Sequence, residues 1–295
     1  MDDLVDSLPG WHRPLPSRIF SGYVDAGESC QNGICYKMHE HYVFVESEKS
    51  PSSDPVILWT NGGPGAASLY GLFVELGPFS LSDRSLTTGD YNKTGVPSLF
   101  RNEYSWSKFA NLLIINSPPP VGFSYCDPKG PSGDGDSCGV WNDTRTADHN
   151  LIFLKNWFKA FPEFSQNDLY LTGESYAGVY VPMLARAILS DRSAEARAIR
   201  LAGWAVGDAC MGTEVLCGNE GPYFYIEFMH GHGQLSDKTY EEIGGACKLH
   251  ELVKEVPRSK HCAAALGRMA GELGGYYAYA LYDECFYRND FLRAQ

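Results

Sequence analysis

Short apolar runs bounded by turn residues recur along the first two-thirds of the chain. Several are continuously apolar and close at Gly or Pro, which is typical of strands covered on both faces, and one alternates imperfectly between apolar and polar positions. The predicted strands cover residues 41–46, 56–60, 112–116, 168–172 and 201–206. Apolar residues at helical spacing predict helices over 147–161 and 177–189, the first capped by Thr144 or Thr146 and followed by Pro162. Strands that alternate with helices predict an α/β fold with a largely parallel sheet.

The pattern changes near residue 210. Helical stretches over 238–254 and 262–282 replace the alternation, and five cysteines lie near or within them. We therefore expect three parts: the sheet-containing core over 1–209, a helical insertion or cap over 210–285, and the start of a return to the core over 286–295.

One strand–turn–helix unit passes through the sequence Gly-Glu-Ser-Tyr-Ala, with Ser175 at its centre. Small residues two before and two after the serine match the nucleophile elbow of hydrolases, a turn too tight for larger side chains. The alternative is that Ser175 only caps a helix, because serine is a favoured capping residue.

A second segment favours the elbow. The strand predicted at 56–60 ends in the glycine-rich sequence Asn-Gly-Gly-Pro-Gly at residues 61–65. Acyl transfer to a serine needs backbone N–H donors for the oxyanion, one after the nucleophile and one from an early loop, and Tyr176 and Gly63 occupy those positions. The alternative is that this loop is an ordinary turn. A phosphate-binding loop is excluded because no Gly-Lys-Ser/Thr follows. Together the two segments predict an α/β-hydrolase fold.

Several longer motifs resemble those of the serine carboxypeptidases. The sequence reads Asn-Gly-Gly-Pro-Gly-Ala-Ala-Ser-Leu at 61–69 and Gly-Glu-Ser-Tyr-Ala-Gly-Val-Tyr-Val-Pro at 173–182. Further matching segments are 8–10, 21–23, 71–79, 117–118, 121–125 and 142–144. The resemblance runs from about residue 7 to about residue 290. It departs at Ala66, where the family usually has Cys, and at Ala67, where it usually has Ser.

The resemblance implies an exopeptidase that releases the last residue of a peptide and therefore recognises a free carboxylate. Asn61 and the Gly62 N–H would donate to that carboxylate, Glu75 and Glu174 would approach it as carboxylic acids, and Trp59 would back the pocket. These five residues follow from the motifs alone. Because two ionised glutamates would repel the substrate, at least one must hold a proton, so activity should favour acid pH. The alternative interpretation is that Glu75 is a solvated helix residue and that Glu174 is merely tolerated at its position in the elbow.

Ser175 also needs a general base, and in this fold the acid and the histidine follow the nucleophile. The later histidines, His230, His232, His250 and His261, lie in the predicted insertion after Asp208 or Asp237. An exposed helix face is their ordinary explanation. In the resembled family the Asp and His come after the insertion. We therefore expect the chain to be truncated at the C-terminal end of the sheet, and to be unstable or aggregation-prone when isolated.

Three accounts of such a chain stay open: a truncated enzyme, one chain of a two-chain enzyme, or a non-catalytic peptide-binding homologue. The expected function is a serine-type carboxypeptidase acting through an acyl-enzyme at acid pH, inactive as this chain alone because the Asp and His are absent. A second chain that carries them is one expected partner. The alternatives are acyl transfer to an alcohol acceptor and peptide binding without catalysis. No cofactor or metal is expected, and the substrates would be peptide or protein C-termini.

Composition narrows the kinds of protein and the cellular locations that fit this sequence. The chain has 24 basic and 36 acidic side chains and a net charge of −12, which is unlike a nucleic-acid-binding protein. No apolar run is long enough to span a membrane. Nine cysteines without a C-x-x-C pair favour disulfides over a zinc site. The sequon at Asn92 suits a glycoprotein, whereas the sequon at Asn142 lies within one of the matching motifs and is interpreted first as structural and second as a glycan site. We expect a vacuolar, lysosomal or extracellular protein, although no signal peptide is visible.

Overall fold

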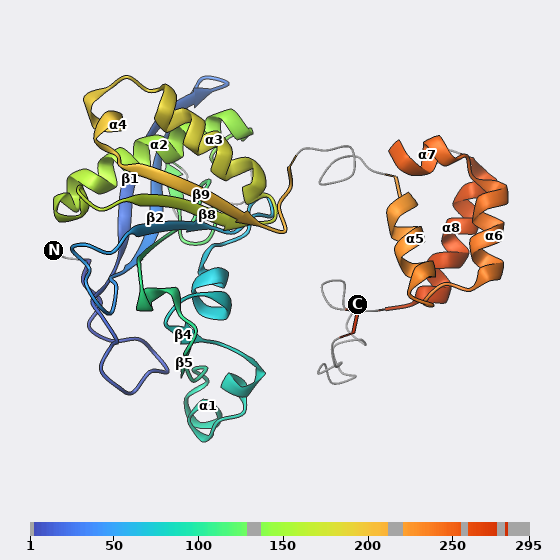
Figure 1. The fold of residues 1–295 in the computed structure, drawn as a ribbon, viewed down its shortest axis with the longest axis horizontal. Coiled ribbons are helices and arrows are strands. Elements are labelled where there is room, and N and C mark those ends of the chain that lie inside the picture. The colour runs from blue at the N-terminus through green and yellow to red at the C-terminus, as the bar shows by residue number, and fades with distance from the viewer. Residues whose placement is uncertain (1–2, 129–136, 212–220, 255–258, 276–280, 283–295) are drawn as a thin grey trace. The chain divides into compact units, whose positions relative to one another are not determined.

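A computed structural model describes residues 3–128, 137–211, 221–254, 259–275 and 281–282 of the chain. Its contacts divide the protein into two compact units, Met1–Met211 and Gly212–Gln295. The first unit is built on a sheet, and the described part of the second unit consists of helices (Figure 1). No helix among the described residues has the length and apolar character needed to cross a membrane.

A mixed sheet forms the centre of the first unit. In the part of the chain that the structure describes, its strands run in the order β1-β2-β6-β3-β8-β9, and β7 pairs with β2. Their bounds are β1 (Ile19–Gln31), β2 (Ile34–Val45), β3 (Val56–Thr60), β6 (Asn111–Ile115), β7 (Tyr125–Asp127), β8 (Leu169–Glu174) and β9 (Leu201–Gly207). A separate two-stranded sheet pairs β4 (Phe79–Ser80) with β5 (Phe100–Arg101).

The sheet is parallel from β6 through β3 and β8 to β9, whereas β1, β2 and β7 are antiparallel. The expectation of a largely parallel sheet therefore holds for one half only. The long β1–β2 hairpin replaces the single short strand predicted at 41–46. Strand β1 escaped the pattern because its buried positions include the small residues Gly22 and Ala26, whereas the apolar ring of Tyr23 is exposed. In β2, the buried Glu40 interrupts the apolar run just before the predicted start.

Helices α2 (Asp143–Ala160) and α3 (Ala177–Ser190) cover one face of the sheet (Figure 1). Between helices and sheet lies an aromatic core that includes Phe44, Phe153, Trp157 and Phe161. The opposite face packs against irregular structure. The remaining helices of this unit are η1 (Gly71–Glu75), η2 (Asp83–Leu86), α1 (Gly89–Thr94), η3 (Trp106–Lys108), η4 (Pro162–Phe164) and α4 (Ala194–Ala198). β3 and β6 are buried on both faces, which explains their continuously apolar sequences.

Helix α2 begins earlier than predicted, and its cap is Asn142 rather than Thr144 or Thr146. The Asn142 side chain accepts a hydrogen bond from the Arg145 N–H at 2.9 Å. Thr146 instead donates its hydroxyl to the Asn142 carbonyl at 3.1 Å. The asparagine of the second sequon therefore has a structural role in starting the helix.

The second unit contains α5 (Tyr223–Gly231), α6 (Asp237–Ala246), α7 (Leu249–Lys254) and α8 (Lys260–Leu273). The single helix predicted over 238–254 is two helices, because Cys247 adopts an extended conformation at the end of α6. Helix α8 ends at Leu273, well before the predicted limit, where Gly274 takes a positive φ of 61°. Residues 276–280 lie outside the described part.

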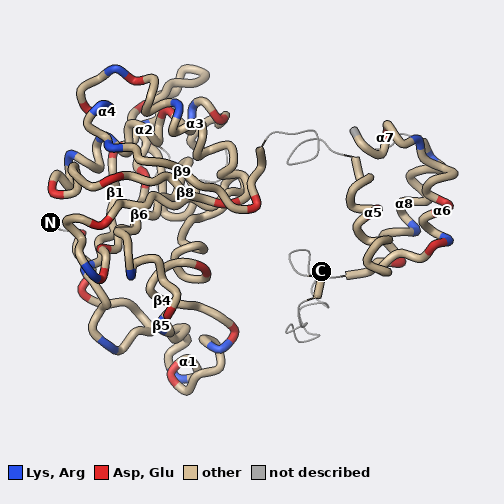
Figure 2. The backbone as a smooth tube through the Cα atoms, viewed as in Figure 1, with Lys and Arg blue, Asp and Glu red and all other residues tan. Residues whose placement is uncertain are grey.

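Disulfides are confirmed. They join Cys30 to Cys35 across the β1–β2 hairpin, Cys126 to Cys138, and Cys247 to Cys262 in the second unit. Acidic and basic residues are interspersed along the described backbone of both units (Figure 2).

A buried carboxyl group in β2 makes the stability of the first unit depend on pH. Glu40 is fully buried and accepts a hydrogen bond from the Ser117 hydroxyl at 3.1 Å. Burial raises its pKa from 4.5 to about 8. Between these values the folded protein retains a proton that the unfolded chain releases. The free energy of unfolding therefore falls as pH rises, by at most about 1.4 kcal/mol per pH unit.

We predict that Glu40→Gln flattens this pH dependence between about pH 5 and pH 8, because the amide is neutral throughout. Urea unfolding followed by tryptophan fluorescence is the measurement, since all six tryptophans lie in the first unit. The exposed Glu195 in α4 offers a matched control, and Glu195→Gln should keep the slope of the original protein. Equal slopes for the original protein and Glu40→Gln would contradict the prediction.

Candidate active site

Ser175 lies on a sharp turn between β8 and α3. Its φ is +56°, in the left-handed region that costs a residue with a side chain about 1–2 kcal/mol. The surrounding backbone holds this conformation. The Ser175 N–H donates to the Gly207 carbonyl at 3.0 Å, and the Ser175 carbonyl accepts from the N–H groups of Gly178 and Cys210, both at 2.9 Å. The strained serine and its position between strand and helix are the geometry of a nucleophile elbow.

The small residues around Ser175 are required by close packing. A Cβ on Gly173 would lie 2.4 Å from the Thr60 carbonyl oxygen and 2.5 Å from the Ala177 Cβ. One on Gly178 would lie 2.6 Å from the Cys210 carbonyl oxygen. Any larger side chain at these glycines would push the turn away from β3 or from the end of β9.

The glycine-rich loop after β3 approaches this turn directly. A Cβ on Gly62 would lie 2.3 Å from the Tyr176 nitrogen and 3.0 Å from the Ser175 Cβ. The next residue, Gly63, has a φ of +108°. Among the hydrogen bonds between described residues, none uses the N–H of Gly63 or of Tyr176. The structure thus brings both predicted oxyanion donors to the same turn as Ser175.

Asn61 is the centre of a second group, the carboxylate clamp, formed with Trp59, Glu75 and Glu174. Its side-chain oxygen accepts from the Trp59 indole N–H at 2.9 Å and from the Gly71 N–H at 3.1 Å. Its amide nitrogen donates to Glu174 Oε1 at 2.7 Å. These bonds fix the orientation of the amide beside both glutamates, because the Asn61 side chain also hydrogen-bonds Glu75.

The two glutamates of the clamp interact. Glu75 is the last residue of the single π-helical turn η1 and is half-buried. Burial, and then the negative charge of Glu174, raise the pKa of Glu75 to about 7. Below that pH the proton on Glu75 limits the negative charge of the clamp, while the amide of Asn61 donates to the Glu174 carboxylate. The clamp thus becomes more negative as pH rises through 7.

Residues beyond the recognisable motifs hold η1 in place. The Asn102 amide donates to the carbonyls of Glu75 at 3.2 Å and Gly77 at 2.9 Å. The Ser105 hydroxyl donates to the Leu76 carbonyl at 3.1 Å. Asn102 and Ser105 therefore position Glu75 through its backbone. No local pattern marks them, because their partners lie 25 to 29 residues away in the sequence.

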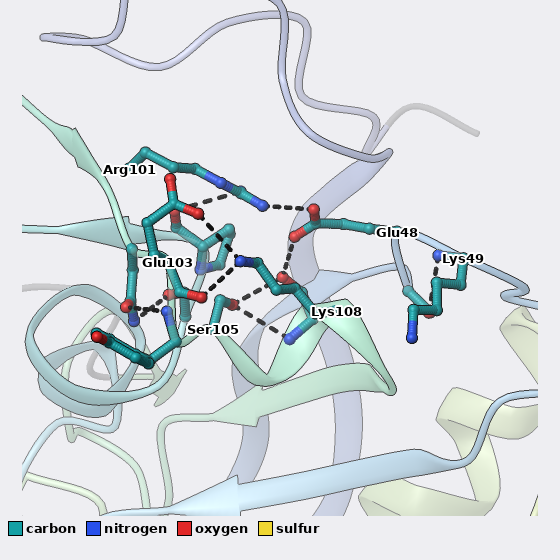
Figure 3. Close-up of polar contacts among 12 residues, drawn as sticks. Glu48, Lys49, Arg101, Glu103, Ser105 and Lys108 are labelled. Carbon is teal, nitrogen blue, oxygen red and sulfur yellow. Dashed lines mark hydrogen bonds and ion pairs between the residues drawn. The ribbon is translucent and has the colours of Figure 1, made fainter.

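A polar network anchors this supporting segment in turn (Figure 3). Glu48 binds Arg101 on one side and accepts from the Ser107 hydroxyl at 2.6 Å on the other. Lys108 pairs with Glu103 at 3.1 Å. These contacts fasten the segment that carries Asn102 and Ser105 to the chain following β2.

A cavity of about 680 Å³ lies on the Tyr176 side of the turn. Its lining residues are Pro64, Gly65, Pro118, Pro119, Pro120, Val121, Gly122, Trp141, Asn142, Asp143, Thr146, Tyr176 and Tyr180. The Tyr176 hydroxyl donates to Asp143 Oδ1 at 3.0 Å. We call this cavity the Asp143 pocket. Glu174, the residue before Ser175, belongs to the carboxylate clamp, and Tyr176, the residue after Ser175, lines the Asp143 pocket.

Comparison with known proteins agrees with this geometry. The family model for serine carboxypeptidases matches residues 9–294. The chain belongs to the serine carboxypeptidase family. Among its relatives, mouse lysosomal protective protein is 36% identical over 96% of the chain and 52% of that protein. Serine carboxypeptidase-like 21 of Arabidopsis thaliana is 34% identical over 96% of the chain and 53% of that protein.

A solved structure shows the same fold. Kex1, a prohormone-processing carboxypeptidase from Saccharomyces cerevisiae, matches with a TM-score of 0.61 at 21% identity, covering 89% of this chain and 54% of Kex1. The α/β-hydrolase fold predicted from the sequence is confirmed. The chain spans about half the length of the curated relatives that it matches.

Within the first unit, no hydrogen bond between described residues joins the Ser175 hydroxyl to a histidine. In the second unit, His230 binds Asp237 at 2.9 Å and stacks on Tyr240, and His232 bonds to the carbonyl of Phe228. In the first unit, burial lowers the pKa of His41 to about 4, and this ring lies between Ser21 and Asn116.

The strain at Ser175 leads to a prediction about stability. The free energy of unfolding of Ser175→Gly should be about 1 kcal/mol higher than that of Ser175→Ala, because glycine adopts a positive φ without a Cβ penalty. Both variants lose the hydroxyl, so their difference isolates the backbone. Urea unfolding followed by tryptophan fluorescence measures it. An alanine variant as stable as the glycine variant would mean that the turn is not strained.

Proposed function

We propose that this protein is the nucleophile-bearing part of a serine-type carboxypeptidase that releases the C-terminal residue of peptides at acid pH. The observation that carries the proposal is that a strained serine, a glycine loop with free N–H groups and a proton-holding glutamate pair meet around one turn. Family membership supports the same class of chemistry.

In this mechanism the Ser175 oxygen attacks the carbonyl carbon of the last peptide bond. The N–H groups of Gly63 and Tyr176 stabilise the oxyanion that forms. A general base takes the serine proton and transfers it to the nitrogen of the departing amino acid, which leaves an acyl-enzyme. Water then attacks the acyl group, and Ser175 is regenerated as the shortened peptide leaves.

The carboxylate clamp supplies the preference for chain ends. The Asn61 amide and the Gly62 N–H donate to the substrate carboxylate, and protonated Glu75 donates its O–H to it. Trp59 backs this site. Each additional negative charge in the clamp weakens binding, so substrate affinity falls as pH rises through about 7.

The general base is proposed to be a histidine, oriented by an aspartate, on a polypeptide segment additional to these 295 residues. A second chain is one source of that segment. The relatives are about twice as long as this chain, which supports a contribution from additional sequence. No metal or cofactor has a part in the proposed reaction.

An acidic vacuole or lysosome, or the extracellular space, is the proposed location. The named lysosomal relative supports it, and the disulfides between described residues fit an oxidising compartment. Asn92 is exposed in α1 and is accessible to a glycan.

Carboxylate recognition is testable on the chain itself, without turnover. We predict that an N-acetyl dipeptide with a free C-terminus binds more tightly than its amide below about pH 7, and that its affinity falls by up to about tenfold per pH unit above 7. In Glu174→Gln, binding should extend toward neutral pH, because the clamp then carries one negative charge fewer. Isothermal titration across pH measures both effects. An unchanged pH profile in Glu174→Gln would contradict the proposed clamp.

Nucleophile reactivity is a separate prediction. In protein isolated from its native source, an organophosphonate should form one covalent adduct on the peptide that contains Ser175, and Ser175→Ala should form none. Peptide mass spectrometry detects the adduct. Absence of labelling would leave a peptide-binding homologue as the better account, whereas labelling with turnover of a sugar ester and not of peptides would favour the acyltransferase alternative.

A further inference from the structure

The Asp143 pocket and the carboxylate clamp lie on opposite sequence neighbours of Ser175. The inference drawn from this arrangement rests on the proposed function. Glu174 and Tyr176 flank Ser175 and face different groups: Glu174 joins Asn61, and Tyr176 lines the pocket. A peptide whose last carboxylate lies in the clamp has its last peptide bond at Ser175. The side chain of the preceding residue then lies on the Tyr176 side, in the Asp143 pocket.

The walls of this pocket are mostly apolar and aromatic, and Asp143 is the one acidic or basic residue among its lining residues. None of the ion pairs between described residues includes Asp143. Its side chain is half-buried and accepts from the Tyr176 hydroxyl at 3.0 Å. The first turn of α2 offsets part of its charge, by about half an elementary charge at most. A net negative charge therefore remains at the pocket.

The nearest basic residue in the sequence is occupied elsewhere. The Arg145 guanidinium lies 4.0 Å from the centre of the Trp141 ring. It donates to the carbonyls of Val140 at 2.6 Å and Cys138 at 3.0 Å. It does not line the pocket, so it leaves the Asp143 carboxylate available to a ligand cation.

A long side chain with an apolar stem and a cationic end matches these features. The stem would contact the proline and aromatic walls, and the cation would reach Asp143 beside the rings of Tyr176 and Tyr180. We propose that Asp143 makes this pocket a subsite for lysine or arginine at the residue immediately before the C-terminal one. The preferred substrates are then peptides with a basic penultimate residue.

Binding of three dipeptides to the 295-residue chain tests this subsite. N-acetyl-Lys-Leu, N-acetyl-norleucyl-Leu and N-acetyl-Glu-Leu share the C-terminal residue and differ in charge at the preceding position. At acid pH and low salt, isothermal titration should show the lysine peptide binding about tenfold more tightly than the norleucine peptide, with the glutamate peptide weakest. Equal affinities for lysine and norleucine would overturn the subsite.

Variants separate the charge of Asp143 from its structural role. Asp143→Asn should remove the lysine preference, so that the lysine and norleucine peptides bind with similar affinity, and Asp143→Glu should retain the preference. Asp148→Asn is the matched control, because Asp148 lies exposed on the same helix and does not line the pocket. A lysine preference that survives in Asp143→Asn would overturn the assignment. Tryptophan fluorescence during unfolding verifies that each variant is folded.

The C-terminal amides of the same peptides separate this inference from the function on which it rests. Tighter binding of acids than amides with no lysine preference refutes the subsite and leaves the carboxypeptidase proposal intact. Equal binding of acids and amides refutes carboxylate recognition, and with it the placement of the penultimate residue in the pocket.

Discussion

The parallel pairing of β3 with β8 is the constraint on which the candidate site depends. In its register Thr60 lies opposite Gly173. The next residues, Asn61 and Glu174, are therefore neighbours and share a hydrogen bond of 2.7 Å. One residue further, Gly62 meets Ser175 and Tyr176 with no room for a side chain. A single strand pair thus places both the glycine-rich loop after β3 and half of the carboxylate clamp against Ser175.

This register also explains why strain at Ser175 is tolerated. The positive φ is held by backbone bonds from the end of β9 and from Gly178, which the core keeps in place. The cost of one unfavourable conformation is small beside the burial of β3 on both sheet faces and of most of β8. A turn at a strand end can therefore stay in a conformation that would relax in a flexible loop.

Local sequence was sufficient where the chemistry depends on local conformation. The elbow is readable because strand, turn and helix follow one another around Ser175, and the fold follows from buried apolar strands. Contacts between distant segments were not readable in this way. Glu75 was assigned only by resemblance, and Asn102 and Ser105 were missed because they bind main-chain carbonyls. The β1–β2 hairpin was underestimated because small residues such as Gly22 and Ala26 occupy the buried positions of β1, and because the charged residue Glu40 is buried in β2.

Those buried polar positions bear on the conditions under which the protein works. Glu40 lies in β2 and bonds to Ser117, whereas Glu75 lies in η1 and interacts with Glu174, so the two acids belong to separate clusters. Each is held neutral mainly by burial, with pKa values of about 8 and about 7. Rising pH therefore weakens the fold through one group and increases the negative charge of the clamp through the other. Because the two effects arise independently and have the same sign, the packing of the fold supports the same preference for acid pH that is proposed for the candidate site.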